Sequence, residues 1–320
     1  MIHDDFDEDH PRATQNNLYH PCFKRYFMSL TDNSKESTLS TAPGLTVTAT
    51  PIGNMGDLSP RARESLEKAD IIACEDTRHT GLMLSRLGIS PGKLVAYHDH
   101  SAATTTTRLI NAMVEGKAVT LVSDAGTPLI SDPGFRLVRG CRENGIAVTT
   151  IPGPSALLAG LAVAGLPTDR FFFGGFLPTA KGQRRKELKA MLPLTATLVF
   201  YESPKRITAT LADLAEMAPD REIAIAREMT KLHEECRYGQ PATLLARYQQ
   251  SGPPKGEIVL MIGPAGAASI PDEADLKQML QRALDDGYSR RDAAGLVSSA
   301  TGAPRRKVYS LSLELDNDNR

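Results

Sequence analysis

Residues 118–134 read AVTLVSDAGTPLISDPG, an apolar β-rich run that passes directly into a polar, glycine-rich loop. An uncharged run of this length between turn residues is typical of a buried strand in a parallel sheet. The small residues at 125–127 would let a ligand approach the backbone closely. Asp124, which emerges from the strand, is suited to bond an amine or a ribose hydroxyl. We therefore predict a ligand-binding loop at the carboxyl end of this strand.

The same pattern repeats on both sides of this stretch. From Gly44 onward, short β-rich runs alternate with helical segments such as 59–69, where Ser59 can cap the helix and Pro60 suits its first turn. This alternation predicts an α/β fold with a mostly parallel sheet covered on both faces, in which ligands bind beyond the carboxyl ends of the strands. The predicted strands of this first unit are 45–50, 71–74, 93–97, 118–123 and 147–152.

A second α/β unit follows the proline-rich turn at 151–155. Its predicted strands are 170–175, 196–201, 222–227 and 256–262, with a helix at 207–217. Three further helical stretches, at 272–287, 290–302 and 304–315, predict a small bundle similar to a helix-turn-helix. We therefore expect four parts: a disordered leader (1–43, in which Met28 is an alternative first residue), an N-terminal α/β domain (44–153), a C-terminal α/β domain (154–268) and a helical segment (269–320).

The composition excludes several classes of protein. The chain has 320 residues, 41% hydrophobic and 23% charged, so it is neither wholly disordered nor fibrous. Its net charge of −1 argues against coating nucleic acid by bulk charge, although local basic patches remain open. It has no apolar stretch near 18 residues, no signal-peptide pattern and no closely spaced cysteines. We expect a cytoplasmic protein with reduced thiols, no membrane partner and no metal.

Three other polar segments follow predicted strands. TPIGNMGD (50–57) reads either as a functional loop or as an ordinary strand-to-helix turn. EDTRHTG (75–81) places four ionisable groups in five positions, which favours function over a solvated helix start. YHDHSAATTTT (97–107) contains two histidines around an acid, but this spacing alone is a weak metal signal. A helix cap or the edge of a substrate cleft is the better interpretation of that segment.

The common motifs of nucleotide and hydrolase sites do not occur. The chain has no GxGxxG after its first strand, no GxxxxGK[ST], no HExxH and no GxSxG. The residues alone therefore predict a two-domain α/β protein that binds something small and polar in a cleft between its domains.

The order of several motifs resembles a known family. TPIGNMGDLSPRA, EDTRHTG, HDH, LVSDAGTPLISDPG, PGPSA, GLPTDRF, GFLP, FYESPKR and KGEIVLMI follow one another here as they do in the ribosomal RNA small subunit methyltransferase I family. The resemblance spans about 44–264, with a weaker match in the helical segment. It implies the two-domain tetrapyrrole methylase (class III methyltransferase) fold and S-adenosylmethionine between the domains. The implied activity is 2′-O-methylation of a cytidine in 16S ribosomal RNA, in the decoding region of the small subunit. Members of this superfamily are commonly homodimers.

The resemblance also implies which residues hold the cofactor. They come from the first-strand loop, the loop after the fourth strand, the PGPSA turn and a strand end of the second domain: Pro51, Gly53, Asp124, Ala125, Gly126, Ser155, Ala156, Tyr201 and Glu202. TPIGNMGD replaces the glycine-rich first loop of tetrapyrrole methylases, which we interpret as a mark of the RNA-modifying branch. The chain also departs from the family's HDHN, because Ser101 stands where the asparagine is common, and no role of that asparagine is carried over.

Methyl transfer to a ribose hydroxyl needs a base or an oxyanion stabiliser, because the hydroxyl is a very weak acid. From loop position and charge, we expect Glu75 or Asp76 to be the base and Arg78 its positive neighbour. His100 is the reserve candidate.

Two clusters of basic residues predict contacts with RNA phosphates. The segment 181–189 has five basic residues against one acid, and it follows a strand from which it could close over the cleft as a lid. The span 282–307 has six basic residues against three acids. A solvated helix face is the alternative for each cluster. The predicted RNA-binding residues are Lys181, Arg184, Arg185, Lys186, Arg290, Arg291, Arg305, Arg306 and Lys307.

Two other functions stay open at this stage. A methylase of a tetrapyrrole intermediate would share the fold, but it has no evident need of the basic clusters. A non-catalytic RNA-binding assembly factor would bind no cofactor and would not depend on Asp124. The apolar helix at 155–166 is either an interior element or a dimer-facing one. The residue pattern does not specify which nucleotide is modified or whether the substrate is naked RNA or a ribosomal subunit.

Overall fold

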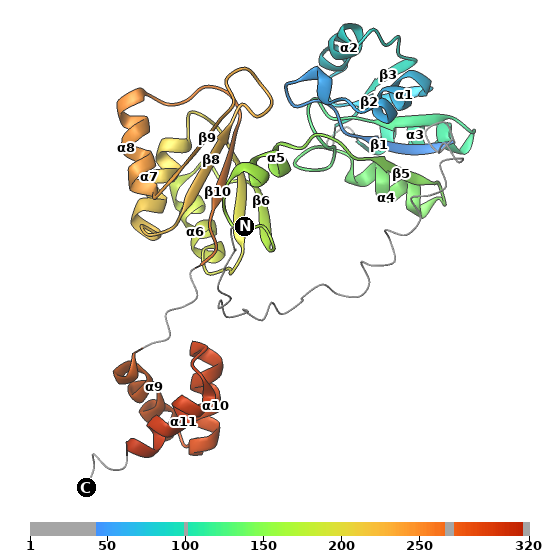
Figure 1. Cartoon of the computed structure of the whole chain (residues 1–320). Helices are drawn as coiled ribbons and strands as arrows, with labels where there is room; N and C mark the ends of the chain where they lie inside the picture. The colour runs from blue at the N-terminus through green and yellow to red at the C-terminus, as the bar shows by residue number, and fades with distance from the viewer. Residues whose placement is uncertain (1–42, 99–101, 266–271, 316–320) are drawn as a thin grey trace, which may run out of the picture.

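The computed structural model describes residues 43–98, 102–265 and 272–315, which form two α/β units and a helical bundle (Figure 1). The predicted leader lies outside these residues apart from Pro43, and so do Asp99, His100 and Ser101 of the His-Asp-His motif. The α/β fold class is confirmed. The exact domain boundaries stay predictions.

The first unit is built on a wholly parallel five-stranded sheet, as the alternation of strands and helices predicts. The strand order is β3-β2-β4-β1-β5, and every pairing in the sheet is parallel. Strand β1 pairs on both sides, with Leu45 opposite Val119 and Val148. The strands are β1 (Gly44–Thr48), β2 (Ile71–Cys74), β3 (Lys93–Ala96), β4 (Ala118–Leu121) and β5 (Val148–Ile151).

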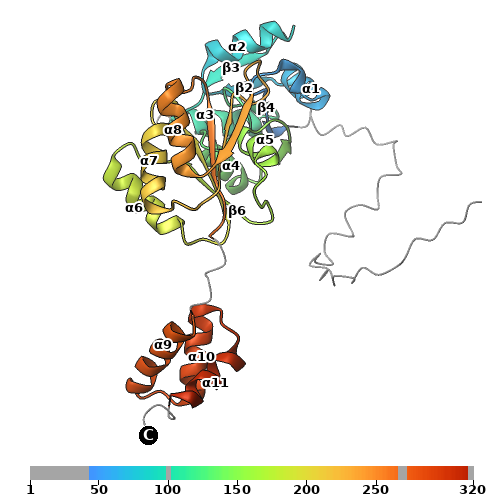
Figure 2. The same cartoon turned by 60° about the vertical axis from the view of Figure 1, so that its left-hand side comes forward.

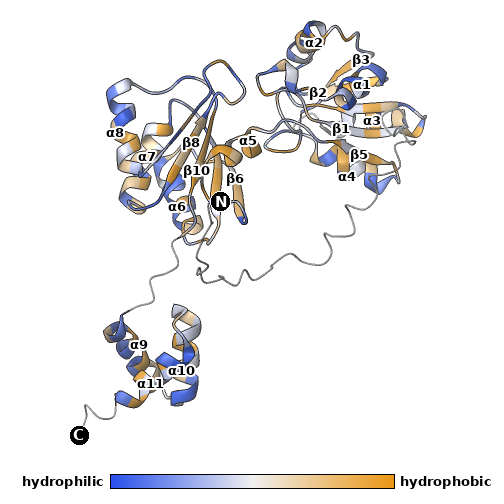
Figure 3. Ribbon diagram, viewed as in Figure 1, coloured by the Kyte–Doolittle hydropathy of each residue, from blue (hydrophilic) through white to orange (hydrophobic). Residues whose placement is uncertain are grey.

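Helices cover both faces of this sheet, because alternate residues of its strands point to opposite faces. On one face, α3 (Ala102–Val114) and α4 (Phe135–Glu143) pack on strand residues that include Leu45 and Leu121. On the other face, α1 (Pro60–Lys68) and α2 (Thr77–Arg86) pack on Ile72 and Cys74. Ser59 caps α1 as predicted, since its side chain accepts a hydrogen bond from the Ala62 backbone. Figure 3 shows that the strands are mostly apolar, whereas helices such as α1 carry both polar and apolar residues.

The second unit has a mixed sheet of order β6-β7-β10-β8-β9, in which β6 and β7 are parallel and the other neighbours antiparallel. Its strands are β6 (Phe171–Phe176), β7 (Thr197–Glu202), β8 (Ile223–Arg227), β9 (Glu235–Gly239) and β10 (Ile258–Ile262). The sequence patterns predict four of them and miss β9. The sequence of that strand, ECRYG, is too polar to be recognised as a strand. It lies at the edge of the sheet, where a strand is partly solvated and can carry polar residues.

Helices α6 (Lys181–Met191), α7 (Ile207–Met217) and α8 (Pro241–Ser251) cover one face of this sheet, and α5 (Ala156–Val163) covers the other (Figure 2). The side of α5 that carries Leu157 and Leu161 is buried on the sheet, while Leu158 on its outer side is 54% exposed. Gly160 permits this close packing, because a Cβ there would lie 3.2 Å from the Cβ of Val259.

The predicted helical bundle is also confirmed. It consists of α9 (Glu273–Asp285), α10 (Arg290–Thr301) and α11 (Arg305–Glu314). Asp272 caps α9 and Ser289 caps α10, each through its side chain. Leu276, Val297 and Val308 belong to a buried core that the three helices share. In the part of the chain that the structure describes, no helix has both the length and the apolar character that a membrane crossing requires.

A buried ion pair joins α6 to α7. Arg184 is only 5% exposed, and its guanidinium bonds the Asp213 carboxylate at 2.7 and 2.8 Å. Arg185 bonds Asp213 and Glu216, which together raise the pKa of its guanidinium. Arg184 therefore cannot reach an RNA phosphate, and the prediction that it binds RNA is wrong. Helical spacing turns it toward the core, although it stands within a run of exposed basic residues.

We predict that Asp213→Ala destabilises the protein by about 3–5 kcal/mol, because it leaves the Arg184 guanidinium buried without its counter-charge. Urea unfolding followed by circular dichroism measures the loss. Glu216→Ala is the matched control, since the Glu216 side chain is 59% exposed and its removal leaves the buried pair intact. Equal unfolding curves for the two variants would contradict this role of Asp213.

Candidate active site between the two units

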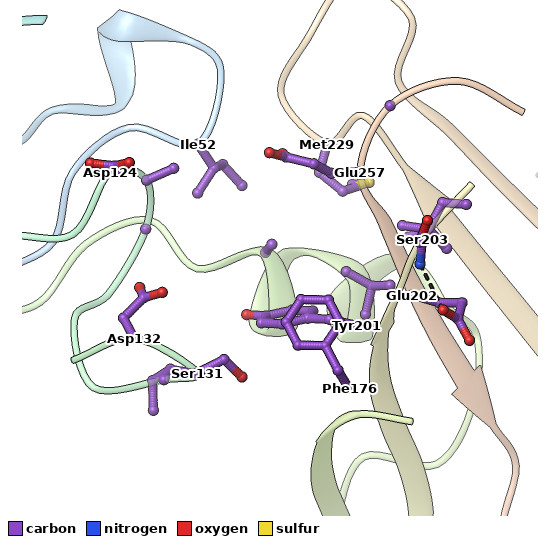
Figure 4. A pocket seen from close by; sticks show the side chains of 18 of the residues that line it. Ile52, Asp124, Ser131, Asp132, Phe176, Tyr201, Glu202, Ser203, Met229 and Glu257 are labelled. Atoms are coloured by element: carbon purple, nitrogen blue, oxygen red, sulfur yellow. Dashed lines mark hydrogen bonds between the residues drawn. The ribbon is translucent and has the colours of Figure 1, made fainter. Parts of the chain in front are cut away.

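A cavity of about 410 Å³ lies between the two α/β units. One wall comes from the loop after β4, with Asp124, Gly126 and Asp132, and the other from the second sheet, with Tyr201 and Phe176 (Figure 4). The position agrees with the rule that ligands bind beyond the carboxyl ends of parallel strands. The cavity is also lined by Ile52, Ala125, Ile130, Ser131, Ala156, Glu202, Met229 and Val259.

Backbone hydrogen bonds fix the loop after β4 in place. Thr50 and Gly126 exchange two of them, at 2.8 and 3.0 Å, so that the loops after β1 and β4 are held together. Thr127 donates from its hydroxyl to the Pro154 carbonyl at 2.9 Å and joins this loop to the turn before α5. The predicted binding loop is thus connected to the chain that enters the second unit.

The loops that face one another across the cavity contain strained backbone. In the described residues, four non-glycine residues have positive φ: Leu129 and Ser131 in the β4 loop, and Glu228 and Thr230 in the loop after β8. Such conformations cost energy and persist only where the surroundings enforce them, and they concentrate at functional sites. Their location on both sides of one cavity supports a functional role for it.

The TPIGNMGD loop closes the cleft at one end. The Asn54 backbone N–H donates to the Thr230 hydroxyl at 3.1 Å. A Cβ on Gly53 would lie 2.4 Å from Lys231 Cγ, so glycine is needed for this approach. Pro51 and Gly53 do not line the cavity, whereas Ile52 between them does. The loop is therefore near the predicted cofactor site, but the residue that faces the cavity was not among those predicted.

Asp132 is the carboxylate with the most perturbed environment on the cavity wall. Burial raises its pKa to about 6, and the charges of Glu75 and Asp124 act in the same direction. A hydrogen bond with the Ser123 hydroxyl partly opposes this shift. Three carboxylates from two loops thus meet at this edge of the sheet. Asp132 stands in the loop that was predicted to bind a ligand, but no role was predicted for it, because its burial depends on the folded loop.

The predicted catalytic residues have different positions. Asp76 caps α2, where it accepts hydrogen bonds from the Arg78 and His79 backbones that lower its pKa. Its own N–H donates to Asp124 at 3.1 Å, so Asp76 has a structural role that accounts for its place in the motif. Burial raises the pKa of Glu75, but Glu75 does not line the cavity. The Arg78 side chain is exposed, and His100 lies outside the described residues.

The second sheet contributes an aromatic wall. Burial raises the pKa of the Tyr201 hydroxyl, although a hydrogen bond with the Leu157 backbone opposes this shift. Ala156 also lines the cavity, but the neighbouring Ser155, at the N-cap position of α5, does not. Glu202 reaches the wall with its carboxylate already bonded, because it accepts from the Ser203 backbone, the Thr210 hydroxyl and Arg206, each at 2.7 Å. Glu202 therefore holds the end of β7 in place.

The described residues contain no cluster of three His, Cys, Asp or Glu side chains arranged to hold a metal ion. Of the predicted RNA-binding residues, Lys181, Lys186, Arg291, Arg305, Arg306 and Lys307 are exposed. Arg290 is half-buried, and Lys307 forms an ion pair with Glu273 at 3.0 Å.

The fold and its interdomain cavity define a class III methyltransferase. The family model "Tetrapyrrole (Corrin/Porphyrin) Methylases" matches residues 44–244. Solved structures share this fold: diphthine synthase (TM-score 0.53, 16% identity, 68% of this chain and 89% of that chain) and uroporphyrin-III-C-methyltransferase from Thermus thermophilus (0.50, 21%, 69% and 94%). A second model, "RsmI C-terminal HTH domain", matches residues 270–316.

Curated relatives indicate which family of methyltransferases the chain belongs to. The chain is 54% identical over 274 residues to the ribosomal RNA small subunit methyltransferase I of Erythrobacter litoralis, covering 86% of this chain and 96% of the relative. It is 45% identical to the protein of the same name from Mesorhizobium japonicum, covering 85% and 92%. The chain therefore belongs to the ribosomal RNA small subunit methyltransferase I family. The predicted cofactor is confirmed for the family, whose members are S-adenosylmethionine-dependent methyltransferases.

Proposed function

We propose that this protein methylates 16S ribosomal RNA at the 2′ oxygen of a cytidine ribose, with S-adenosylmethionine as the methyl donor. The observation that supports it most is a cavity with a half-buried, weakly acidic carboxylate, Asp132, in a chain whose curated relatives carry the name of a small-subunit ribosomal RNA methyltransferase.

The residues that line the cavity fit the cofactor. Ile52, Ile130 and Met229 provide apolar surface for an adenine ring, while Asp124 supplies a carboxylate for an ammonium group or a ribose hydroxyl. Gly126 has a φ of +83°, and a Cβ there would lie 3.3 Å from Ile52 Cγ2, so a larger residue would crowd this wall. When bound, the cofactor supplies an electrophilic methyl group. Six of the predicted cofactor residues line the cavity. We keep Asp124, Ala125, Gly126, Ala156 and Tyr201 as our assignment and leave out Glu202, because its carboxylate is already bonded within the protein.

Two properties of this chain promote the reaction. The walls from the two units hold the donor and the hydroxyl together, and proximity of this kind removes much of the entropic barrier. In this proposal Asp132 accepts the proton of the 2′ hydroxyl as O2′ takes the methyl group from the sulfonium sulfur, whose S–CH₃ bond breaks, so that the proton ends on the Asp132 carboxylate. A base with a pKa of about 6 is ionised at neutral pH and still accepts a proton more readily than an ordinary aspartate. We therefore assign the role of general base to Asp132 in place of Asp76. The negative charge of Glu75 favours the protonated form of Asp132.

Exposed cations support an RNA substrate. Lys181 and Lys186 project from α6, and Arg291, Arg305 and Arg306 project from the helical bundle. Such groups bind phosphates by releasing counterions, which contributes affinity without sequence information. The small ribosomal subunit as the actual substrate, a cytoplasmic location and a homodimer are parts of the same proposal. The exposed Leu158 on α5 supports a dimer contact on that helix.

The function is tested with small ribosomal subunits from a strain that lacks this gene. We expect the purified protein to transfer labelled methyl groups from S-adenosylmethionine to one cytidine ribose, located by nuclease digestion and mass spectrometry. Label on a base, or on protein alone, would contradict ribose methylation. Cofactor binding without any label on the subunits would contradict the proposed substrate.

We predict that Asp132→Asn lowers kcat by about 100- to 10,000-fold, the usual range for removal of a general base. In the wild type, kcat/KM should rise with pH through about 6 and then level off, because only the ionised carboxylate accepts the proton. Steady-state kinetics between about pH 5 and 8, on either side of that pKa, measures both effects. Asp220→Asn, at an exposed aspartate, is the control. A kcat of Asp132→Asn within a few-fold of wild type would exclude this role.

We predict that Lys181→Ala together with Lys186→Ala weakens RNA binding and reduces the slope of log K against log salt by about one for each phosphate that the protein no longer neutralises. Filter binding at several salt concentrations measures the slope. Lys93→Ala, at the amino end of β3, is the matched control because parallel strands place that end away from the site. An unchanged slope in the double variant would show that α6 presents only a solvated face.

A further inference from the structure

An irregularity in β6 directs a phenylalanine to the cavity. Along β6 and β7, Phe173 pairs with Val199, but the next pair is Phe176 with Tyr201, so three steps on β6 match two on β7. In a regular strand, side chains three positions apart point to opposite faces. The bulge, in which Gly175 has a φ of +65°, places both phenylalanine rings against Tyr201, with centroids 5.0 and 5.5 Å away. Bulges beside active sites commonly redirect a side chain in this way.

Gly174 has a packing reason to be glycine, and Gly175 has a conformational one, since its φ is +65°. A Cβ on Gly174 would lie 2.3 Å from Cε1 of the buried Phe200, so any side chain there would displace the core. A Cβ on Gly175 would lie 3.7 Å from the hydroxyl oxygen of Ser131, so the bulge adjoins the strained loop of the first unit. The ring of Phe176 is therefore held at the junction of the two units.

Phe176 is 57% exposed although it lines the cavity. A large aromatic ring gains little stability from such a position, because more than half of it stays in water. Tyr201 behind it packs edge-on against Phe173, which fixes the support of the Phe176 ring. The arrangement presents a rigid aromatic surface at the mouth of the cavity, across from the proposed base Asp132 on the facing wall (Figure 4).

We propose that Phe176 stacks on the base of the nucleotide that is methylated. This inference rests on the proposed function, because methyl transfer to O2′ requires the target ribose in the cavity and so brings its attached base to the mouth. Enzymes that act on a single nucleotide draw it out of its stack, and unstacked RNA bases commonly bind on aromatic side chains. Stacking also suits a cytosine, whose small ring offers few other apolar contacts.

The experiment compares four variants on small ribosomal subunits that lack the modification. With Phe176→Ala we expect the KM for subunits to rise about 5- to 100-fold, the equivalent of removing one stacked ring. The Kd for S-adenosylmethionine, measured by calorimetry, should stay within twofold. Phe176→Leu should behave like the alanine variant, since it restores apolar volume without an aromatic face, whereas Phe176→Tyr should remain near wild type. Phe172→Ala is the matched control, because Phe172 is 42% exposed on the same strand and does not line the cavity.

Each other outcome overturns the inference in a distinct way. A weakened Kd for S-adenosylmethionine with an unchanged KM for subunits would show that Phe176 stacks on the cofactor. A change in molar mass by light scattering would show that Phe176 belongs to a subunit interface. Full activity of Phe176→Leu would show that only volume matters. If the wild-type protein labels no cytidine ribose, the proposed function is wrong. This outcome differs from the three above, because each of those requires an active wild type.

Discussion

The paired hydrogen bonds between Thr50 and Gly126 are the interaction on which the site depends. Parallel strands bring the ends of β1, β2 and β4 to one edge, but they do not determine how the following loops are arranged. This bridge holds the β1 and β4 loops together. Ile52 and Asp124 consequently share one wall, and the Asn54 backbone reaches Thr230 in the other unit. The cavity is a consequence of that loop pairing.

Most of the fold could be predicted because the central strands of both sheets are buried on both faces. The strands of the first sheet are short apolar runs, and covered parallel sheets require such runs. The start of α1 was also recognisable, because Ser59 is a capping residue that satisfies a free backbone N–H group. Asp272 and Ser289 cap α9 and α10 in the same way, although they were not predicted to do so. Strand β9 was missed because an edge strand is partly solvated and carries charged residues such as Glu235.

The site was less predictable, because its chemistry depends on burial. Arg184 and Lys186 look alike in the basic segment, yet one is paired with Asp213 in the core and the other is exposed. Asp76 and Asp132 are both acids in strand-end loops. Backbone hydrogen bonds lower the pKa of the first, while burial raises that of the second. Charge and position in the sequence are local properties, whereas desolvation comes from residues far along the chain.

The two units contribute different chemistry to the one cavity. The first supplies carboxylates on a loop whose strained residues, Leu129 and Ser131, fix its shape. The second supplies an aromatic wall whose orientation depends on the bulge in β6. Since neither wall is complete alone, the separation of the units sets the distance between the acids and the rings. The contact of Gly53 with Lys231 limits that separation. A glycine that does not line the cavity therefore belongs to the machinery of the site.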